Sequence, residues 1–147
     1  MPSRTALSFL LPLLLAQPLA ASAAQPIVEV YKTATCGCCK GWIKHLEANG
    51  FSVKAQDVAN PGDYRAKFGI PDEHGSCHSA KVQGYAIEGH VPASDIKRML
   101  ATRPQAAGLA VPGMPMGSPG MEGAHSDPYE VLLVKKDGTT GVYKRYR

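Results

Sequence analysis

The sequence of 147 residues lacks the features that mark several common classes of protein. Its net charge is only +4, and lysine and arginine are not gathered into the dense cluster that nucleic-acid binding requires. Two separated Cys-x-x-Cys knuckles, the usual pattern of a structural zinc domain, are absent. No internal repeat is present. These absences argue against a nucleic-acid partner and against a zinc-knuckle domain.

The composition instead suits one globular domain. Hydrophobic residues make up 44% of the chain and charged residues 19%, a balance typical of a soluble domain with a core and a solvated surface. The chain also holds 15 glycines and 12 prolines, which predict several long loops.

The first 23 residues have the pattern of a secretory signal peptide. Residues 1–4 include the basic Arg4, residues 6–15 are mostly apolar, and residues 21–23 have the small-x-small form of a cleavage site. The apolar run is too short to cross a bilayer as a mature helix. We therefore predict a signal peptide over 1–23 and a single domain over 24–147. Cleavage after Ala24 and a retained membrane anchor are the alternatives.

Three of the four cysteines, Cys36, Cys38 and Cys39, are crowded into four positions. In an exported protein an even number of cysteines usually indicates disulfides. A disulfide within this cluster closes almost no loop, so it would add little stability. The cluster is therefore better placed for chemistry than for stabilising a fold.

Hydrophobic periodicity predicts a β-α-β-α-β-β-α order with a hairpin after it. The expected strands lie at residues 27–31, 51–55, 81–85 and 86–90, and the expected helices at 39–49, 63–68 and 93–102. Residues 108–127 show no periodicity, and the final hairpin is expected at 129–135 and 139–146.

A β-α-β unit with Cys-x-x-Cys between its first strand and its helix is typical of thioredoxin-type domains. The predicted fold class is therefore α/β and thioredoxin-like. It has a βαβ-α-ββα core, an added C-terminal β-hairpin and a long Gly/Pro/Met loop. The pattern does not predict where the hairpin attaches.

The cysteine cluster is expected at the N-terminus of a helix, where the positive end of the helix dipole favours thiolate over thiol. Thiolate is both the nucleophile of disulfide exchange and a ligand of soft metals. Cys36 and Cys39 have the spacing of a redox dithiol, which makes them the candidate catalytic residues. The spacing alone does not choose between redox chemistry and metal capture.

The third sulfur, Cys38, favours metal binding. It would compete in a clean dithiol exchange, whereas three thiolates can share or bridge metal ions. In a thioredoxin-like fold the loop before the third strand lies beside the Cys-x-x-Cys turn, so Cys77 and His78 are expected there. Soft thiolate and thioether ligands select Cu(I). The long loop adds three thioethers, those of Met114, Met116 and Met121.

Five ordered motifs resemble the CopG-type copper-resistance family. They are residues 36–42 (CGCCKGW), 76–80 (SCHSA), 88–92 (EGHVP), 108–115 (GLAVPGMP) and 117–122 (GSPGME). The resemblance covers residues 28–146. It implies a thioredoxin-like fold, a periplasmic location, and copper bound by the Cys-x-Cys-Cys and Cys-His motifs. It also implies redox interconversion of copper within a resistance system. By position, the family's ligands fall on Cys36, Cys38, Cys39 and Cys77, with His78 as a further candidate.

Plainer interpretations stand beside these. The cysteine cluster can be one disulfide with a buried free thiol. His78 can bond a backbone group, and packing is the favoured interpretation of Met114, Met116 and Met121. The other histidines have structural or surface interpretations: packing or capping for His90, a solvated position for His45, and weak Cu(II) or Zn²⁺ contacts for His74 and His125. Trp42 is expected in the core, shielding one side of the sulfur cluster.

The sequence thus predicts an exported copper-binding protein that holds more than one Cu(I) ion, with cysteine sulfurs bridging the ions. Its expected partners are copper ions and other periplasmic copper-handling proteins, with no nucleic acid and no membrane span after processing. Whether the chain is an enzyme stays open, with copper oxidoreductase as the activity in view. The alternatives are a thiol–disulfide oxidoreductase acting on copper-protein cysteines, a copper metallochaperone, and, least favoured, a structural zinc domain.

Overall fold

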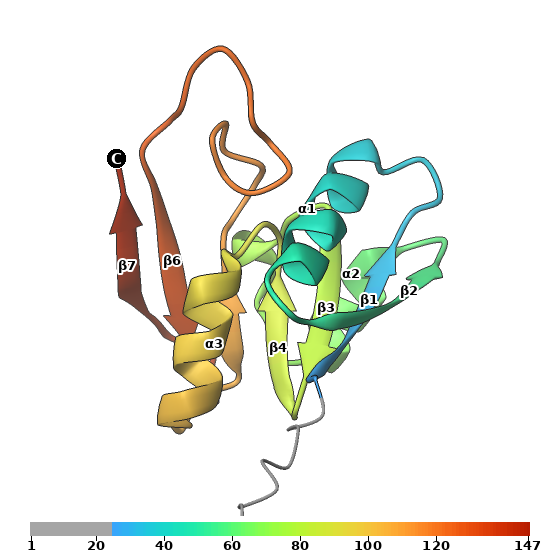
Figure 1. The fold of residues 1–147 in the computed structure, drawn as a ribbon. Helices are drawn as coiled ribbons and strands as arrows, with labels where there is room; N and C mark the ends of the chain where they lie inside the picture. Colours follow the sequence, from blue (N-terminus) through green and yellow to red (C-terminus); the bar gives the residue numbers. More distant parts are fainter. Residues whose placement is uncertain (1–24) are drawn as a thin grey trace, which may run out of the picture.

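A computed structural model describes residues 25–147, and the predicted signal peptide over 1–23 lies outside them. The described residues form a mixed α/β fold with a seven-stranded sheet and three α-helices (Figure 1). Within this range no helix has the length and apolar character needed to cross a membrane. The elements are β1 (Ile27–Lys32), α1 (Gly37–Ala48), β2 (Ser52–Asp57), α2 (Pro61–Lys67), the 3₁₀ helix η1 (Asp72–His74), β3 (His78–Val82), β4 (Tyr85–Glu88), α3 (Ala93–Thr102), β5 (Gly108–Ala110), β6 (Tyr129–Val134) and β7 (Thr140–Tyr146).

The strands lie in the order β2-β1-β3-β4-β5-β6-β7. β1 and β2 are parallel and are joined through α1, because a parallel pair needs a crossover connection. β3 runs antiparallel to β1, and β4 runs antiparallel to β3. β5 returns parallel to β4 after α3, and the β6–β7 hairpin extends the sheet from β5.

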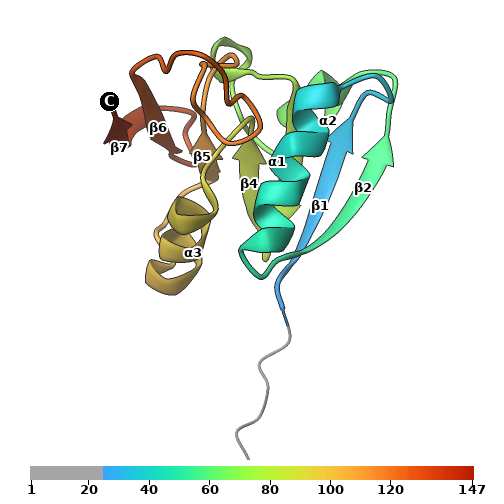
Figure 2. The same ribbon diagram turned by 45° about the horizontal axis from the view of Figure 1, so that its top comes forward.

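The helices divide between the two faces of the sheet. α1 and α3 lie on one face and α2 on the other (Figures 1 and 2). Val28 and Val30 of β1 point to the α1 face and are fully buried, as the two-residue period of a strand requires. Trp42 and Leu46, one turn apart on α1, close this core together with Ile96 and Met99 of α3.

The pairing of β1 with β3 fixes where the cysteines meet. Lys32, the last residue of β1, lies opposite His78, the first residue of β3. The turn that follows β1 and the segment that precedes β3 therefore emerge at the same edge of the sheet. That edge holds the Cys-x-Cys-Cys motif on one side and Cys77 on the other.

Two details of the predicted order are wrong. The stretch from residue 108 is not irregular throughout, because Gly108–Ala110 forms β5, to which the C-terminal hairpin attaches. A strand of three residues is too short to show a period. In addition, β3 and β4 lie at 78–82 and 85–88 rather than 81–85 and 86–90, so His78 belongs to a strand and not to a loop.

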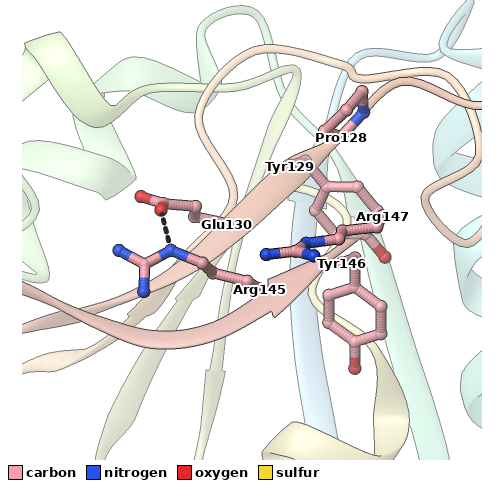
Figure 3. Close-up of a pocket in the computed structure, with 6 residues that line it drawn as sticks. All are labelled: Pro128, Tyr129, Glu130, Arg145, Tyr146 and Arg147. Atoms are coloured by element: carbon pink, nitrogen blue, oxygen red, sulfur yellow. Dashed lines mark hydrogen bonds and ion pairs between the residues drawn. The ribbon is translucent and has the colours of Figure 1, made fainter.

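A hydrogen bond and a cation–π contact tie the hairpin to α3, and aromatic stacking joins its two strands. The rings of Tyr129 and Tyr146 stack with centroids 4.8 Å apart and line an open pocket (Figure 3). The Tyr146 hydroxyl donates to the carboxylate of Asp95 on α3 at 2.6 Å, and Asp95 is only 2% exposed. Arg98, on the same helix, lies over the ring of Tyr143 with its Cζ 3.8 Å from the ring centroid.

Replacing Tyr146→Phe is expected to lower the free energy of unfolding by about 1.5–3 kcal/mol, because the hydrogen bond goes to a charged and buried acceptor. Urea unfolding at neutral pH measures the difference. Tyr143→Phe is the matched control on the same strand: its buried hydroxyl has no hydrogen-bond partner among residues 25–147, so its loss should change stability by less than about 0.5 kcal/mol. Equal effects of the two substitutions would show that the Tyr146–Asp95 bond does not anchor the hairpin.

Candidate metal centre

The cysteine motif forms the first turn of α1. Cys36 is the residue before the helix, in an extended conformation, and its N–H donates to the carbonyl of Thr33 at 3.2 Å to close the turn. Cys38 and Cys39 follow within the first helical turn. The N–H groups of a first turn have no partner inside the helix and carry the positive end of its dipole, so they stabilise negative charge on these sulfurs.

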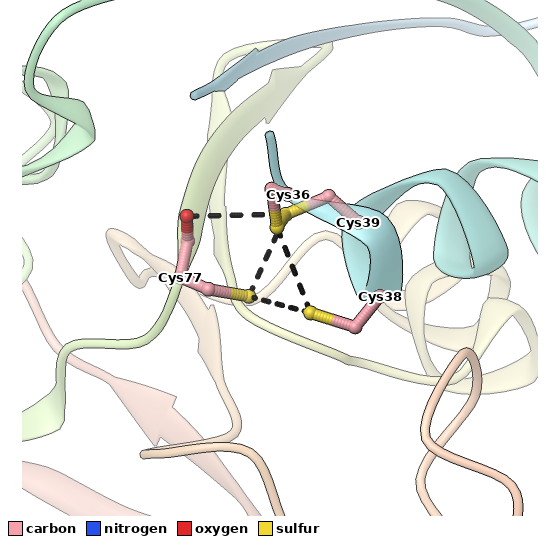
Figure 4. A group of neighbouring side chains, drawn as sticks. All are labelled: Cys36, Cys38, Cys39 and Cys77. Atoms are coloured by element: carbon pink, nitrogen blue, oxygen red, sulfur yellow. Dashed lines mark hydrogen bonds between the residues drawn. A yellow bond between two sulfur atoms is a disulfide. The ribbon is translucent and has the colours of Figure 1, made fainter. Parts of the chain in front are cut away.

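All four cysteine sulfurs converge (Figure 4). Cys36 and Cys39 are joined in a disulfide, and Cys38 and Cys77 are free thiols. The Sγ atom of Cys38 lies 3.6 Å from that of Cys36 and 3.7 Å from that of Cys77, and the Cys39 and Cys77 sulfurs are 3.6 Å apart. Sulfurs from segments 39 residues apart thus share one site.

Two buried histidines extend the site beyond the sulfurs. The Sγ atom of Cys77 lies 3.1 Å from Nε2 of His90 and 3.4 Å from Nδ1 of His78. Nδ1 of His90 is 2.8 Å from the carbonyl oxygen of Pro119, which can only accept, so Nδ1 carries the proton and Nε2 offers a lone pair. A backbone carbonyl that fixes the tautomer in this way is the usual support of a metal-binding histidine.

Burial controls the charge of the ligand groups. Desolvation and the nearby His90 lower the pKa of His78 to about 3, and desolvation lowers the pKa of His90. Both rings are therefore neutral at pH 7, the form that binds metal. Desolvation and the neighbouring Cys38 raise the pKa of the Cys77 thiol to about 12. Cys77 thus keeps its proton at neutral pH in the metal-free protein, and a cation binding there must release it.

A buried carboxylate holds the segment that carries Cys77. Glu88 on β4 accepts hydrogen bonds from the backbone N–H of Ser76 at 2.8 Å and from the hydroxyl of Ser79 at 2.6 Å. Arg65 of α2 donates to the same carboxylate at 3.1 Å. The residues on both sides of the Cys77-His78 pair are therefore fixed from one point, which limits how far the Cys77 sulfur can move.

The long loop lies directly against the cysteine helix. Gly120, with φ +86°, has no room for a side chain: a Cβ there would lie 2.5 Å from the backbone nitrogen of Trp42 and 2.7 Å from the backbone oxygen of Cys38. A Cβ on Gly41 would in turn lie 2.9 Å from the Gly120 Cα atom. This contact between two backbones brings the Pro119 carbonyl to His90.

The three methionines are not equivalent. Sδ of Met114 lies 3.9 Å from Sγ of Cys38, and Met114 is 50% exposed. Among residues 25–147, neither Met116 nor Met121 makes such a contact with a cysteine sulfur. The structure therefore brings Met114 to the sulfurs and leaves the other two predicted methionines in the loop.

The structure also places the other residues that the sequence singles out. It brings together Cys36, Cys38, Cys39, Cys77 and His78, and Trp42 is buried with its ring centroid 4.3 Å from that of His78. His45 is not a plain solvated residue, because its Nε2 accepts a hydrogen bond from the N–H of Ala93 at 3.0 Å. Neither His74 nor His125 is part of the groups of potential ligands found in the described part of the chain.

His90 is the functional candidate that the sequence analysis assigns to packing, although it lies in the EGHVP motif of residues 88–92. Its predicted packing role leaves out the contact with Cys77, because the expected strand boundaries put the β3–β4 turn too late. The true turn at Gln83 and Gly84 pairs Ser79 with Glu88. Extending that register by two residues sets Cys77 opposite His90. Gly84 is the sequence signal for the correct position of this turn, because glycine favours tight turns.

Comparisons with known proteins agree with the resemblance of the sequence motifs to the CopG-type family. A family model described as "Protein of unknown function, DUF411" matches residues 74–121, which include Cys77, His78, His90 and the long loop. A solved structure titled "Copper resistance protein copG- Form 2" is 45% identical, with a TM-score of 0.79 over 84% of this chain and 99% of that one. A second, "Form 1", is 46% identical, with a TM-score of 0.78 over 83% and 98% of the two chains. A search of curated proteins gave no match.

Because of the close contact at Gly120, we expect replacement by alanine to cost much more stability there than at Gly50, a glycine of similar backbone conformation. Gly50→Ala, at φ +84° with open space around it, should lose about 1–2 kcal/mol of stability from the left-handed backbone alone. Gly120→Ala should lose more, and it should displace the loop so that Cys38 and Cys77 react faster with a thiol reagent in the oxidised protein. Urea unfolding and the kinetics of thiol labelling measure the two effects. Unchanged labelling rates in Gly120→Ala would show that the packing of the loop on α1 does not limit access to the two thiols.

Proposed function

The chain belongs to the CopG copper-resistance family, and we propose that it is an exported copper-binding protein that holds Cu(I) in its cysteine–histidine centre. One observation carries the proposal: thiols from the start of α1 and from the segment before β3 share one site with the unprotonated Nε2 atom of His90. Soft sulfur ligands with imidazole support suit Cu(I).

The arrangement also supports more than one copper ion. Cys77 belongs to two overlapping groups of ligand atoms, one with the other three cysteines and one with His78 and His90. In each group the ligand atoms lie within 4.8 Å of one another. Once the Cys36–Cys39 disulfide is reduced, a Cys77 thiolate shared by the two groups can bridge two ions. Copper is here the cargo that the site receives, and the thioether of Met114 at the edge of the site fits copper better than zinc.

We further assign the N-terminal part of the sheet to the thioredoxin-like class. The support is its topology: parallel β1 and β2 joined by a helix that begins at the Cys-x-x-Cys turn, then antiparallel β3 and β4, then α3. Export to the periplasm rests on the signal-peptide pattern of residues 1–23. The mass of the mature protein tests it, since retention of those residues would contradict cleavage.

The disulfide suggests how copper binding is coupled to redox change. Reduced Cys36 and Cys39 hold two electrons, and forming their disulfide can reduce two Cu(II) ions to Cu(I) with release of two protons. Cys38 and Cys77 remain thiols in the oxidised form, so they and His90 can retain the Cu(I) produced. Cys36 and Cys39 are in this proposal the reacting pair, and the protein acts as a copper oxidoreductase.

A thiol–disulfide oxidoreductase acting on copper-protein cysteines is the second candidate, favoured by the same disulfide at a helix N-terminus. A metallochaperone that passes copper on without redox change is the third. Cys38 separates the first two functions, because dithiol exchange needs only Cys36 and Cys39.

Cys38→Ser is therefore expected to weaken Cu(I) binding by at least about tenfold, or about 1.4 kcal/mol, while reduction of a disulfide substrate such as insulin stays nearly unchanged. Anaerobic titration of the reduced protein with Cu(I) against a competing chelator measures the affinity, and X-ray absorption at the copper edge reports the ligands. Sulfur should dominate the first shell. Strong reductase activity with negligible copper binding by the unchanged protein would favour the oxidoreductase instead.

Adding Cu(II) to the reduced protein without oxygen should abolish the paramagnetic Cu(II) signal of two ions per molecule, because one disulfide supplies two electrons. Peptide mapping should then find the Cys36–Cys39 disulfide, with Cys38 and Cys77 still open to alkylation after copper removal. The double variant Cys36→Ser/Cys39→Ser should form no such bond. Copper bound with its Cu(II) signal intact would refute the redox step and support the chaperone.

A further inference from the structure

The metal centre is shielded on one side and open on the other. Cys39, Trp42, His78 and His90 are all fully buried, so metal cannot reach the sulfurs from the core. Cys36, Cys38 and Cys77 are all partly buried, and Met114 beside Cys38 is half exposed. The pair formed by the Cys38 thiol and the Met114 thioether therefore lies on the side where the site meets solvent.

Met114 is held at this edge by the backbone of its own loop. The N–H of Gly113 donates to the carbonyl of Gly75 at 2.9 Å, and the hydroxyl of Ser76 donates to the carbonyl of Gly113. Both bonds tie the loop to the residues just before Cys77. Packing does not account for this arrangement, because a core-filling methionine is buried, whereas Met114 is among the most exposed large hydrophobic residues of the described chain.

The chemistry of a thioether suits a transient ligand. It is neutral and soft, so it binds Cu(I) and discriminates against harder ions. Unlike Cys77, it has no proton to release before it binds. An exposed thioether can therefore join the coordination of a Cu(I) ion that is entering or leaving, without a change in charge or redox state.

We propose that Met114 is the exchange ligand of this protein: it binds Cu(I) together with Cys38 during entry and departure and is not a ligand of the resting site. This inference rests on the proposed Cu(I)-binding function. The donor or acceptor at this edge is a molecule that itself presents soft thiolate or thioether ligands, and copper passes to it through a shared intermediate.

The test compares Met114→Leu with Met116→Leu and Met121→Leu, which remove a thioether from the same loop without touching the cysteines. Each protein is loaded with Cu(I) anaerobically, and transfer to the chromogenic chelator bicinchoninate is followed by stopped flow in both directions. Met114→Leu should slow uptake and release alike by about tenfold, equivalent to about 1.4 kcal/mol in the barrier, with affinity unchanged. The two control variants should match the unchanged protein.

Two results would overturn the inference. Faster release with weaker affinity in Met114→Leu would make Met114 a permanent ligand, because removing such a ligand destabilises the bound state. Rates equal to those of the controls would make it a surface residue without a role in exchange. In either case Cu(I) binding by the unchanged protein remains intact, whereas failure of the unchanged protein to bind Cu(I) would refute the proposed function itself.

Discussion

The antiparallel pairing of β1 with β3 is the constraint on which the candidate metal centre depends. It places the last residue of β1 opposite the first residue of β3, so the segments that adjoin these two residues meet at one edge of the sheet. The cysteine turn comes from one segment and Cys77 from the other, and the β3–β4 register then adds His90. Backbone hydrogen bonds of a buried sheet thus bring the potential ligand atoms together.

Burial then gives the site its chemical character. Trp42 and the fully buried histidines remove water from the inner side, which keeps the rings neutral and the Cys77 thiol protonated. The helix dipole acts in the opposite sense on the sulfurs at the start of α1. The centre therefore includes one sulfur, that of Cys77, which loses its proton only when a cation binds, and this links metal loading to proton release.

Local patterns in the sequence were enough to predict much of this structure. The α3 helix, the hairpin and the helix at the cysteine motif each have clear periodic or turn signals, and the order of the elements from β1 to α3 follows from them. The short strand β5 has no readable period, since Gly108 and Ala110 present almost no side chain to pack. The contact between His90 and Cys77 is hard to predict for a different reason. It depends on strand register, and a shift of the turn by two residues changes that register. The contact between Gly41 and Gly120 joins distant backbones, and no local pattern predicts it.

The network around Glu88 has a consequence for the lifetime of the site. The short helix α2 has no fully buried residue, and it is attached to the sheet by the stacking of Tyr64 on Tyr31 and by the Arg65–Glu88 ion pair. Short segments with little buried surface open locally at a small fraction of the free energy of global unfolding. Each such opening removes the cation that neutralises Glu88, and the same carboxylate restrains the backbone before Cys77. Local opening of α2, on the opposite face of the sheet, thereby removes one of the three hydrogen bonds that hold the carboxylate beside the Cys77 segment.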